Sequence, residues 1–466
     1  MTWLDVALRF AAEQGVDPRW TDALACLASP EPRGGPPPGP ERPWTGGFED
    51  LEVADLPVPA LDDVDPEQAA MFGRRIEAVS ARLAALGGPE GRVLRVGLRV
   101  RLAGMAEARG PQAVRVRALA DFYYSLAAQL ESARAGRVRS LEDAARSVWW
   151  ASVEPGIEHA RVDGPGPMGP MHVNVLRIDP RRFAPRVVDL RAHGGDLAAF
   201  AVAHGAPVAT SGGFFLYSEP DIGPPSQRGD PVGLFVSGGV VHGPAWFPRG
   251  ALVSGPAGVD VGVVSVHPEP LTRAVAKRGP DVPSVARVGT RTVATGRSLE
   301  VPLDGAVFTG VSEAPVLEHR LEGAPVRIDE GIAGGPMLVR NGEVCIDLRS
   351  EGFWGTAPPV TFSQDETGDQ NLLPRLAVGL DREGRVLVAA VDGRNFERAL
   401  GMTLRQLADW MRLLGCERAT NLDGGSSKRM VVHGREVDLA STEVRSDGGA
   451  TPVRPVRTGI LWLPRG

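Results

Sequence analysis

The spacing of hydrophobic positions along the chain changes near residue 150. Before this point Ala, Leu and Arg recur at helical intervals, whereas beyond it Val and Gly dominate in short alternating runs separated by turns. Runs of strands with few helices between them are typical of α+β proteins. We therefore predict an all-helical N-terminal region over residues 1–148. A domain of mainly antiparallel or mixed β-sheet with a few helices follows over residues 149–466.

Helix signals are strongest where a capping residue precedes an apolar stripe. Asp65 can cap a helix that has Pro66 at its first position, and Thr403 can cap another that ends before Gly415. A stretch rich in Pro and Gly, residues 29–44, excludes regular structure and indicates a loop or linker. The predicted helices cover residues 3–14, 19–27, 66–86, 94–109, 112–135, 141–150, 197–204 and 403–414. The predicted strands or hairpins cover residues 171–179, 233–243, 261–268, 336–348, 375–393, 419–422 and 430–437.

Composition and charge exclude several classes of function. The 466 residues carry a formal net charge of −6, so the chain as a whole is a poor binder of nucleic acid or of an anionic membrane. No run of about 18 apolar residues predicts a membrane span. The three cysteines stand far apart, which disfavours a disulfide framework or a structural zinc site. No acidic cluster has the spacing of a calcium loop, so no metal or other cofactor is expected.

The N-terminal segment carries an early Asp5 and lacks the basic start and long apolar run of a signal peptide, so we expect a cytoplasmic location. Charge is uneven in the helical region. Residues 91–140 hold ten Arg against three acidic residues, and residues 48–68 hold eight acidic residues and no basic one. Arg-rich helices occur in nucleic-acid-binding proteins, but we expect the acidic segment to pack on the basic helices or to face solvent. The helical region is a candidate surface for a protein partner or for self-association.

Four turns rich in Gly and polar residues follow or precede predicted strands in the second part of the chain. Consecutive glycines allow backbone N–H groups to converge on an anion. In the strongest turn Asp423 adds a carboxylate, and Ser427 and Lys428 add donors. Together the turns favour a site for an anionic, polyhydroxylated ligand. They are Thr210-Ser211-Gly212-Gly213-Phe214-Phe215, Ala333-Gly334-Gly335-Pro336, Val391-Asp392-Gly393-Arg394 and Asn421-Leu422-Asp423-Gly424-Gly425-Ser426-Ser427-Lys428.

The motifs GGFF, GGPMLVRNG, PRLAVG, VDGR, GMTL and NLDGG occur in this order over residues 150–466. In this order they resemble the phosphodiester glycosidase family. The resemblance implies hydrolysis of a sugar-1-phosphodiester, such as an α-N-acetylglucosamine-1-phospho group, to free sugar and phosphomonoester. It also implies a substrate with a sugar-phosphate group. Two departures are present: Ser211 stands where members usually have Asn, and Lys428-Arg429 add positive charge to the last loop.

The resemblance also implies roles for individual residues. Asp423 is expected to act as nucleophile or general base, with Asp392 as its partner or as a structural ligand of Arg394. Carboxylates near the anomeric carbon stabilise or attack an oxocarbenium-like transition state. The phosphate is expected to meet Arg375, Arg394 and Lys428, helped by the Gly424-Gly425 amides. The remaining candidate substrate-binding residues are Ser211, Gly212, Gly213, Phe214, Gly335, Pro336, Asn421 and Ser427.

Two other functions remain open from the sequence. A binding module could hold a sugar phosphate or a cell-wall glycan without cleaving it, with Ser211 as a mark of lost activity. Alternatively, the enzyme could hydrolyse a nucleotide sugar or another phosphorylated metabolite, with the helical region as a lid or a partner dock. The sugar, the aglycone and the stereochemical course are not specified by the sequence.

Overall fold

The computed structural model describes residues 61, 66–106, 112–135, 139–216, 229–353 and 371–465. The predicted helices at 3–14 and 19–27, the loop at 29–44 and most of the acidic segment lie outside these residues. Within them the prediction of an α+β fold is confirmed, since every strand ladder is antiparallel and helices dominate before residue 147. None of the described helices is both long and apolar enough to cross a bilayer.

The helices lie close to their predicted positions. The helix at Pro66 has the predicted bounds, and Thr403 caps the late helix in a capping box with Gln406. The predicted helix over 141–150 is shorter, because Ser147 caps its C-terminus and a strand begins at Ala151. The helices are α4 (Pro66–Leu86), α5 (Gly88–Ala106), α6 (Gln112–Ala135), α7 (Leu141–Arg146), α8 (Leu197–Ala203) and α10 (Leu404–Leu413).

Four antiparallel sheets make up the rest of the molecule. The first, in spatial order, contains β1 (Ala151–Glu154), β2 (Ile157–Gly166), β3 (Gly169–Ile178), β19 (Val386–Val391), β18 (Arg375–Asp381), β20 (Cys416–Leu422), β16 (Met337–Arg340) and β17 (Glu343–Val344). The second contains β22 (Arg435–Glu436), β21 (Met430–Val432), β5 (Val208–Ser211), β23 (Thr458–Pro464) and β4 (Phe183–Asp189). The third contains β14 (Ala324–Pro325), β13 (Glu318–Leu321), β9 (Gly258–His267), β8 (Arg249–Gly255), β15 (Glu330–Ala333), β6 (Phe235–Ser237) and β7 (Val240–Gly243), and the fourth contains β11 (Arg291–Gly296), β10 (Ser284–Val288) and β12 (Gly305–Thr309).

The eight-stranded sheet is the central layer, and its middle strands β18 and β19 are buried on both faces. On one face Val175 and Ala389 pack against Trp410 of α10 and Ala144 of α7. On the other face its side chains meet those of the five- and seven-stranded sheets, among them Trp462 of β23. Every residue of β18 and β19 is buried, which accounts for their continuous apolar sequences.

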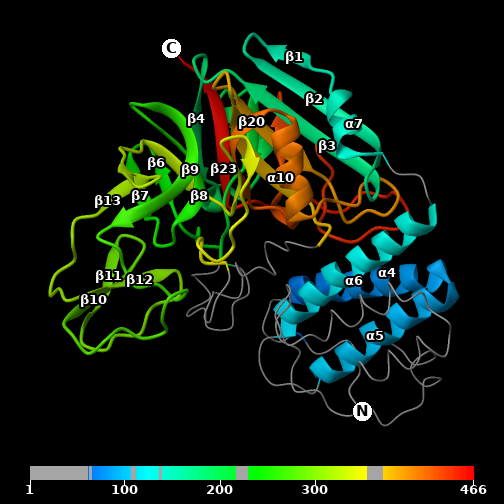
Figure 1. The fold of residues 1–466 in the computed structure, drawn as a ribbon, viewed down its shortest axis with the longest axis horizontal. Helices are drawn as coiled ribbons and strands as arrows, with labels where there is room; N and C mark the ends of the chain where they lie inside the picture. The colour runs from blue at the N-terminus through cyan, green and yellow to red at the C-terminus, as the bar shows by residue number, and fades with distance from the viewer. Residues whose placement is uncertain are drawn as a thin grey trace.

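Helices α4, α5 and α6, which we call the helical unit, form a separate layer at one end of the sheets (Figure 1). Their mutual core contains Phe72 and Tyr123, both fully buried. The same core extends into loops of the β-rich part through Phe215, Phe396 and Leu400. The helical unit is therefore packed onto the ends of the strands where the glycine-rich turns lie.

Candidate active site

An open cleft lies between the helical unit and the loops at the ends of β5, β19 and β20. Arginine, phenylalanine and glycine residues make up slightly more than half of its wall. The residues that line it are Met71, Phe72, Arg75, Arg117, Asp121, Phe214, Phe215, Leu373, Pro374, Arg375, Arg394, Asn421, Leu422, Asp423, Gly424, Gly425, Ser426, Ser427 and Arg454. The cleft thus contains five arginines against two aspartates, which suits an anionic ligand.

Asp423 follows β20 directly and lies half-buried in the cleft. Its backbone N–H donates to the carbonyl of Gly212 at 3.1 Å, which ties the loop to the turn after β5. Burial raises the pKa of Asp423 to about 6, although Arg454, the Ser427 hydroxyl and Arg117 partly oppose the rise. A carboxylate that exchanges a proton near neutral pH and faces a cleft has the properties of a catalytic acid, base or nucleophile.

The predicted glycine-rich turns converge through backbone contacts. Asn421 holds Gly335 from both sides: its carbonyl accepts from the Gly335 N–H at 2.8 Å, and its side-chain amide donates to the Gly335 carbonyl at 2.9 Å. A Cβ on Gly424 would lie 2.5 Å from the carbonyl oxygen of Pro374, so the loop can pack here only with glycine. The Gly425 N–H donates to that same carbonyl at 2.9 Å, so this amide is not directed at a cleft ligand as the sequence had suggested.

Arg394 reaches the cleft in a fixed position. It is a non-glycine residue with a φ of 61°, and its guanidinium forms a two-pronged ion pair with Asp121 of α6 at 2.8 and 2.7 Å. Arg75 of α4 lies 3.8 Å from the same carboxylate and donates to the Ser426 hydroxyl at 2.9 Å. Burial alone would raise the pKa of Asp121, but Arg394, Arg75 and Arg117 outweigh it and hold the pKa below its usual range. The partner of Arg394 is therefore Asp121 and not the expected Asp392.

Asp392 and Lys428 lie outside the cleft in a buried ion cluster. The Lys428 ammonium is fully buried and pairs with the carboxylates of Asp392 and Asp438. Asp392 also contacts the His172 ring and accepts from the Leu439 N–H at 3.1 Å. Burial works against its ionised form, yet Lys428 and His172 lower the pKa of Asp392 below its usual range. This arrangement fixes the loops behind the cleft, and the positive charge of Lys428 is neutralised there.

The other predicted residues divide between the cleft wall and its support. Phe214, Asn421 and Ser427 line the cleft, as does Arg375, whose guanidinium donates to the carbonyls of Met402 at 2.9 Å and Asn371 at 3.0 Å. The Ser211 hydroxyl accepts from the Arg429 N–H at 2.9 Å and does not line the cleft. Gly212, Gly213, Gly335 and Pro336 likewise do not line the cleft.

Sequence reasoning missed the wall contributed by the helical unit. Arg117 and Asp121 are four residues apart on α6 and so share one face, and Arg75 reaches the cleft from α4. The available signal was an acid, Asp121, four residues after Arg117 in a segment that holds ten Arg against three acidic residues. Among the described residues, no group of three or more His, Cys, Asp or Glu side chains could hold a metal ion.

Comparison with known proteins identifies the family of the chain. Residues 204–462, more than half of the chain, match the family model described as phosphodiester glycosidase. The chain belongs to the phosphodiester glycosidase family. The matched region includes every cleft residue outside the helical unit, so the prediction from the ordered motifs is confirmed.

Curated relatives in the family match over shorter spans. The N-acetylglucosamine-1-phosphodiester alpha-N-acetylglucosaminidase of Bos taurus is 30% identical over 168 residues, which are 35% of this chain and 29% of the relative. The Mus musculus protein of the same name is 32% identical over 133 residues, 28% of this chain and 24% of the relative. The chain therefore matches less than a third of the length of either relative.

Solved structures align with longer spans of the chain. A hypothetical protein from Synechocystis aligns with a TM-score of 0.46 and 20% identity, over 68% of this chain and 64% of its own. The catalytic domain of the zebrafish N-acetylglucosamine-1-phosphodiester alpha-N-acetylglucosaminidase, described as auto-inhibited by its pro-peptide, aligns with a TM-score of 0.42 and 18% identity. That alignment covers 68% of this chain and 88% of the zebrafish chain.

Proposed function

We propose that this protein hydrolyses a sugar-1-phosphodiester at the anomeric C1–O bond and releases free sugar and a phosphomonoester. The observation that carries the proposal is Asp423, a carboxylate with a raised pKa at the wall of an arginine-rich cleft. Membership of the phosphodiester glycosidase family supports the reaction class. The names of the bovine and mouse relatives make N-acetylglucosamine the first sugar to test.

In the proposed reaction the C1–O bond breaks and its electron pair leaves on the phosphate oxygen. The oxygen of water bonds to C1, either directly or after Asp423 has formed a transient bond there, and the released proton passes to Asp423 or to solvent. The transition state resembles an oxocarbenium ion, so an ionised carboxylate near C1 stabilises it. Above its pKa of about 6, Asp423 is ionised and available as nucleophile or base.

The charge of the cleft supports an anionic leaving group. A phosphodiester carries one negative charge, and the departing phosphomonoester carries more. Cationic groups that gain attraction as this charge develops bind the transition state more strongly than the substrate. Because the leaving phosphate is a weak base, its departure requires little protonation, and one active carboxylate is sufficient in this account.

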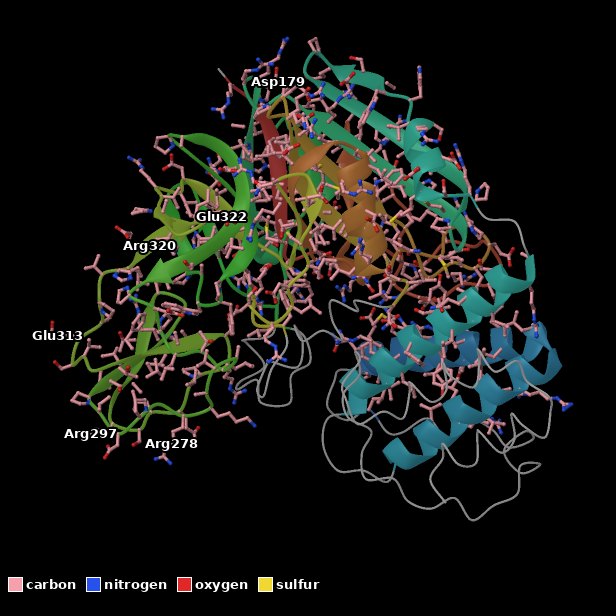
Figure 2. The ribbon with its side chains drawn as sticks, in the orientation of Figure 1. Asp179, Arg278, Arg297, Glu313, Arg320 and Glu322 are labelled. Carbon is pink, nitrogen blue, oxygen red and sulfur yellow. The ribbon has the colours of Figure 1, made fainter. Side chains whose placement is uncertain are left out.

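The test measures free sugar and phosphomonoester release from a panel of α-sugar-1-phosphodiesters and nucleotide sugars. Asp423→Asn is expected to lower turnover by about a hundredfold or more with the fold intact. The matched control is Asp179→Asn, which removes a carboxylate at the end of the molecule away from the helical unit (Figure 2) and is expected to retain full turnover.

Two outcomes would contradict the proposal. If both variants keep wild-type rates, Asp423 has no part in the chemistry. If a sugar phosphodiester binds tightly to the wild type and no product forms, the protein is a sugar-phosphate binding module. Product from nucleotide sugars alone would keep Asp423 in its role and change the substrate class.

A further inference from the structure

The helical unit is held against the cleft by contacts that leave it in one position. The Tyr124 hydroxyl donates to the carbonyl of Leu400 at 2.8 Å, and the Leu372 N–H donates to the Ser125 hydroxyl at 2.9 Å, both in buried surroundings. Together with the shared apolar core, these bonds place α6 against the loops that carry the cleft. A side chain on this face of α6 is therefore fixed relative to Asp423.

Arg117 is the residue of α6 whose charge acts on the reaction centre. Arg117 lines the same cleft as Asp121 and Asp423, and its positive charge helps to lower the pKa of both carboxyls. Asp121 is one helical turn further along and directs its carboxylate to Arg394. One face of α6 thus presents both a cation and a group that positions a second cation.

The five cleft arginines have different surroundings. Arg75 and Arg394 share the Asp121 carboxylate, so much of their charge is balanced. Arg375 donates to two main-chain carbonyls. Arg117 and Arg454 line the cleft with Asp423, and both charges oppose the rise in its pKa. A phosphate attached to a sugar whose C1 lies at Asp423 would meet these two cations.

We propose that the helical unit completes the active site: Arg117 binds the phosphate of the substrate beside Asp423, and Asp121 is a positioning residue that holds Arg394. This inference rests on the proposed function and names the part of the chain that recognises the leaving group. Guanidinium groups match phosphate through paired, charge-assisted hydrogen bonds. The attraction grows as the phosphodiester becomes a phosphomonoester, so Arg117 contributes more to kcat than to KM.

The experiment compares Arg117→Ala with wild type on two substrates of the same sugar. One is the α-1-phosphodiester, and the other is a 4-nitrophenyl α-glycoside, which has no phosphate. We expect kcat/KM on the phosphodiester to fall by about 100-fold, mainly in kcat, while the nitrophenyl glycoside changes by less than about threefold. Arg117→Lys keeps the charge without the paired hydrogen bonds. Its kcat/KM on the phosphodiester is expected to lie between those of wild type and Arg117→Ala.

The matched control is Arg74→Ala. Arg74 precedes Arg75 on α4, is half-exposed and pairs with Glu443 at 2.6 Å across the same interface, but it does not line the cleft. Its removal weakens the seating of the helical unit without changing the charge of the wall, so both substrates are expected to keep wild-type rates. Equal losses in Arg74→Ala and Arg117→Ala would show that only the docking of the helices matters.

Three results would overturn the inference: an equal loss on both substrates, no loss, or a gain of activity in Arg117→Ala. An equal loss would make Arg117 structural, and a gain would make the helical unit a block on the cleft. If the wild type cleaves neither substrate, the proposed function fails, and inorganic phosphate binding measured by calorimetry decides the role of Arg117. Phosphate binding that is at least tenfold weaker in Arg117→Ala than in the wild type supports this role. Equal binding by the variant and the wild type contradicts it, and so does a wild type that binds no detectable phosphate.

Discussion

Replacing Asp423 by asparagine is expected to stabilise the folded protein at neutral pH while it lowers turnover. Burial raises the pKa of this carboxyl from 3.8 to about 6. A carboxyl with a folded-state pKa above its unfolded value favours folding most at low pH. That contribution is lost as the pH rises from about 4 through about 6. Each unit of difference between the folded and unfolded pKa corresponds to about 1.36 kcal/mol, so the ionised carboxylate lowers the free energy of unfolding by at most about 3 kcal/mol. Because Asp423 faces an open cleft, water screens part of this cost, and roughly 1 to 3 kcal/mol remains.

Urea denaturation of wild type and Asp423→Asn at about pH 4 and about pH 7.5 measures this cost. At each pH, subtracting the free energy of unfolding of the wild type from that of the variant removes the contribution of all other titrating groups. We expect the variant to gain roughly 1 to 3 kcal/mol relative to wild type between the lower and the higher pH. Asp179→Asn serves as the control and is expected to show no such gain. A difference that is the same at both pH values would refute the claim that Asp423 titrates near pH 6.

Three further predictions concern the cleft and the buried ion cluster of Lys428. The acidic limb of kcat/KM is expected near pH 6, since the reaction uses ionised Asp423; a rate that is constant from about pH 5 to 8 would exclude this role. Asp121→Asn removes the ion-pair partner of two buried guanidinium groups. It is expected to lower the free energy of unfolding by about 3 to 5 kcal/mol and to lower kcat. A variant with the urea stability and kcat of the wild type would show that this ion pair is dispensable. Lys428→Ala leaves two buried carboxylates without their cation. It is expected to lower the free energy of unfolding by about 3 to 5 kcal/mol in urea denaturation, and by less at low pH, where the carboxylates take up protons. A decrease below about 1 kcal/mol would contradict the importance of this ion cluster.

The sequence predicted those parts of the fold that depend on local signals. The helix at Pro66 and the capped helix after Thr403 were correct because a cap, a first-turn residue and an apolar stripe all occur within one segment. Strands β4 and β23 were not predicted. They pair with each other from opposite ends of the β-rich part of the chain, so contacts between remote segments determine their formation.

The candidate site was predicted in part for the same reason. The glycines of the loop at Asp423 are a local signal that the sequence shows, and the structure places this carboxylate in the cleft. The orientation of Lys428 was not predictable, because it depends on Asp438 and Asp392 approaching from other segments. The helical wall was missed because Arg117 and Asp121 on a charged helix have the same pattern as a solvent-exposed face. Only the packing of α6 on the loops shows which side faces the cleft.

Hydrolysis in water enriched in oxygen-18 is the most direct test of the central claim that the C1–O bond is cleaved. The wild type is incubated with an α-sugar-1-phosphodiester, the products are separated, and their masses are measured by mass spectrometry. The account predicts that the heavy oxygen enters the free sugar and that the phosphomonoester remains unlabelled. Label in the phosphomonoester would mean that water attacks phosphorus, which would make the protein a phosphodiesterase and remove Asp423 from attack at the anomeric carbon.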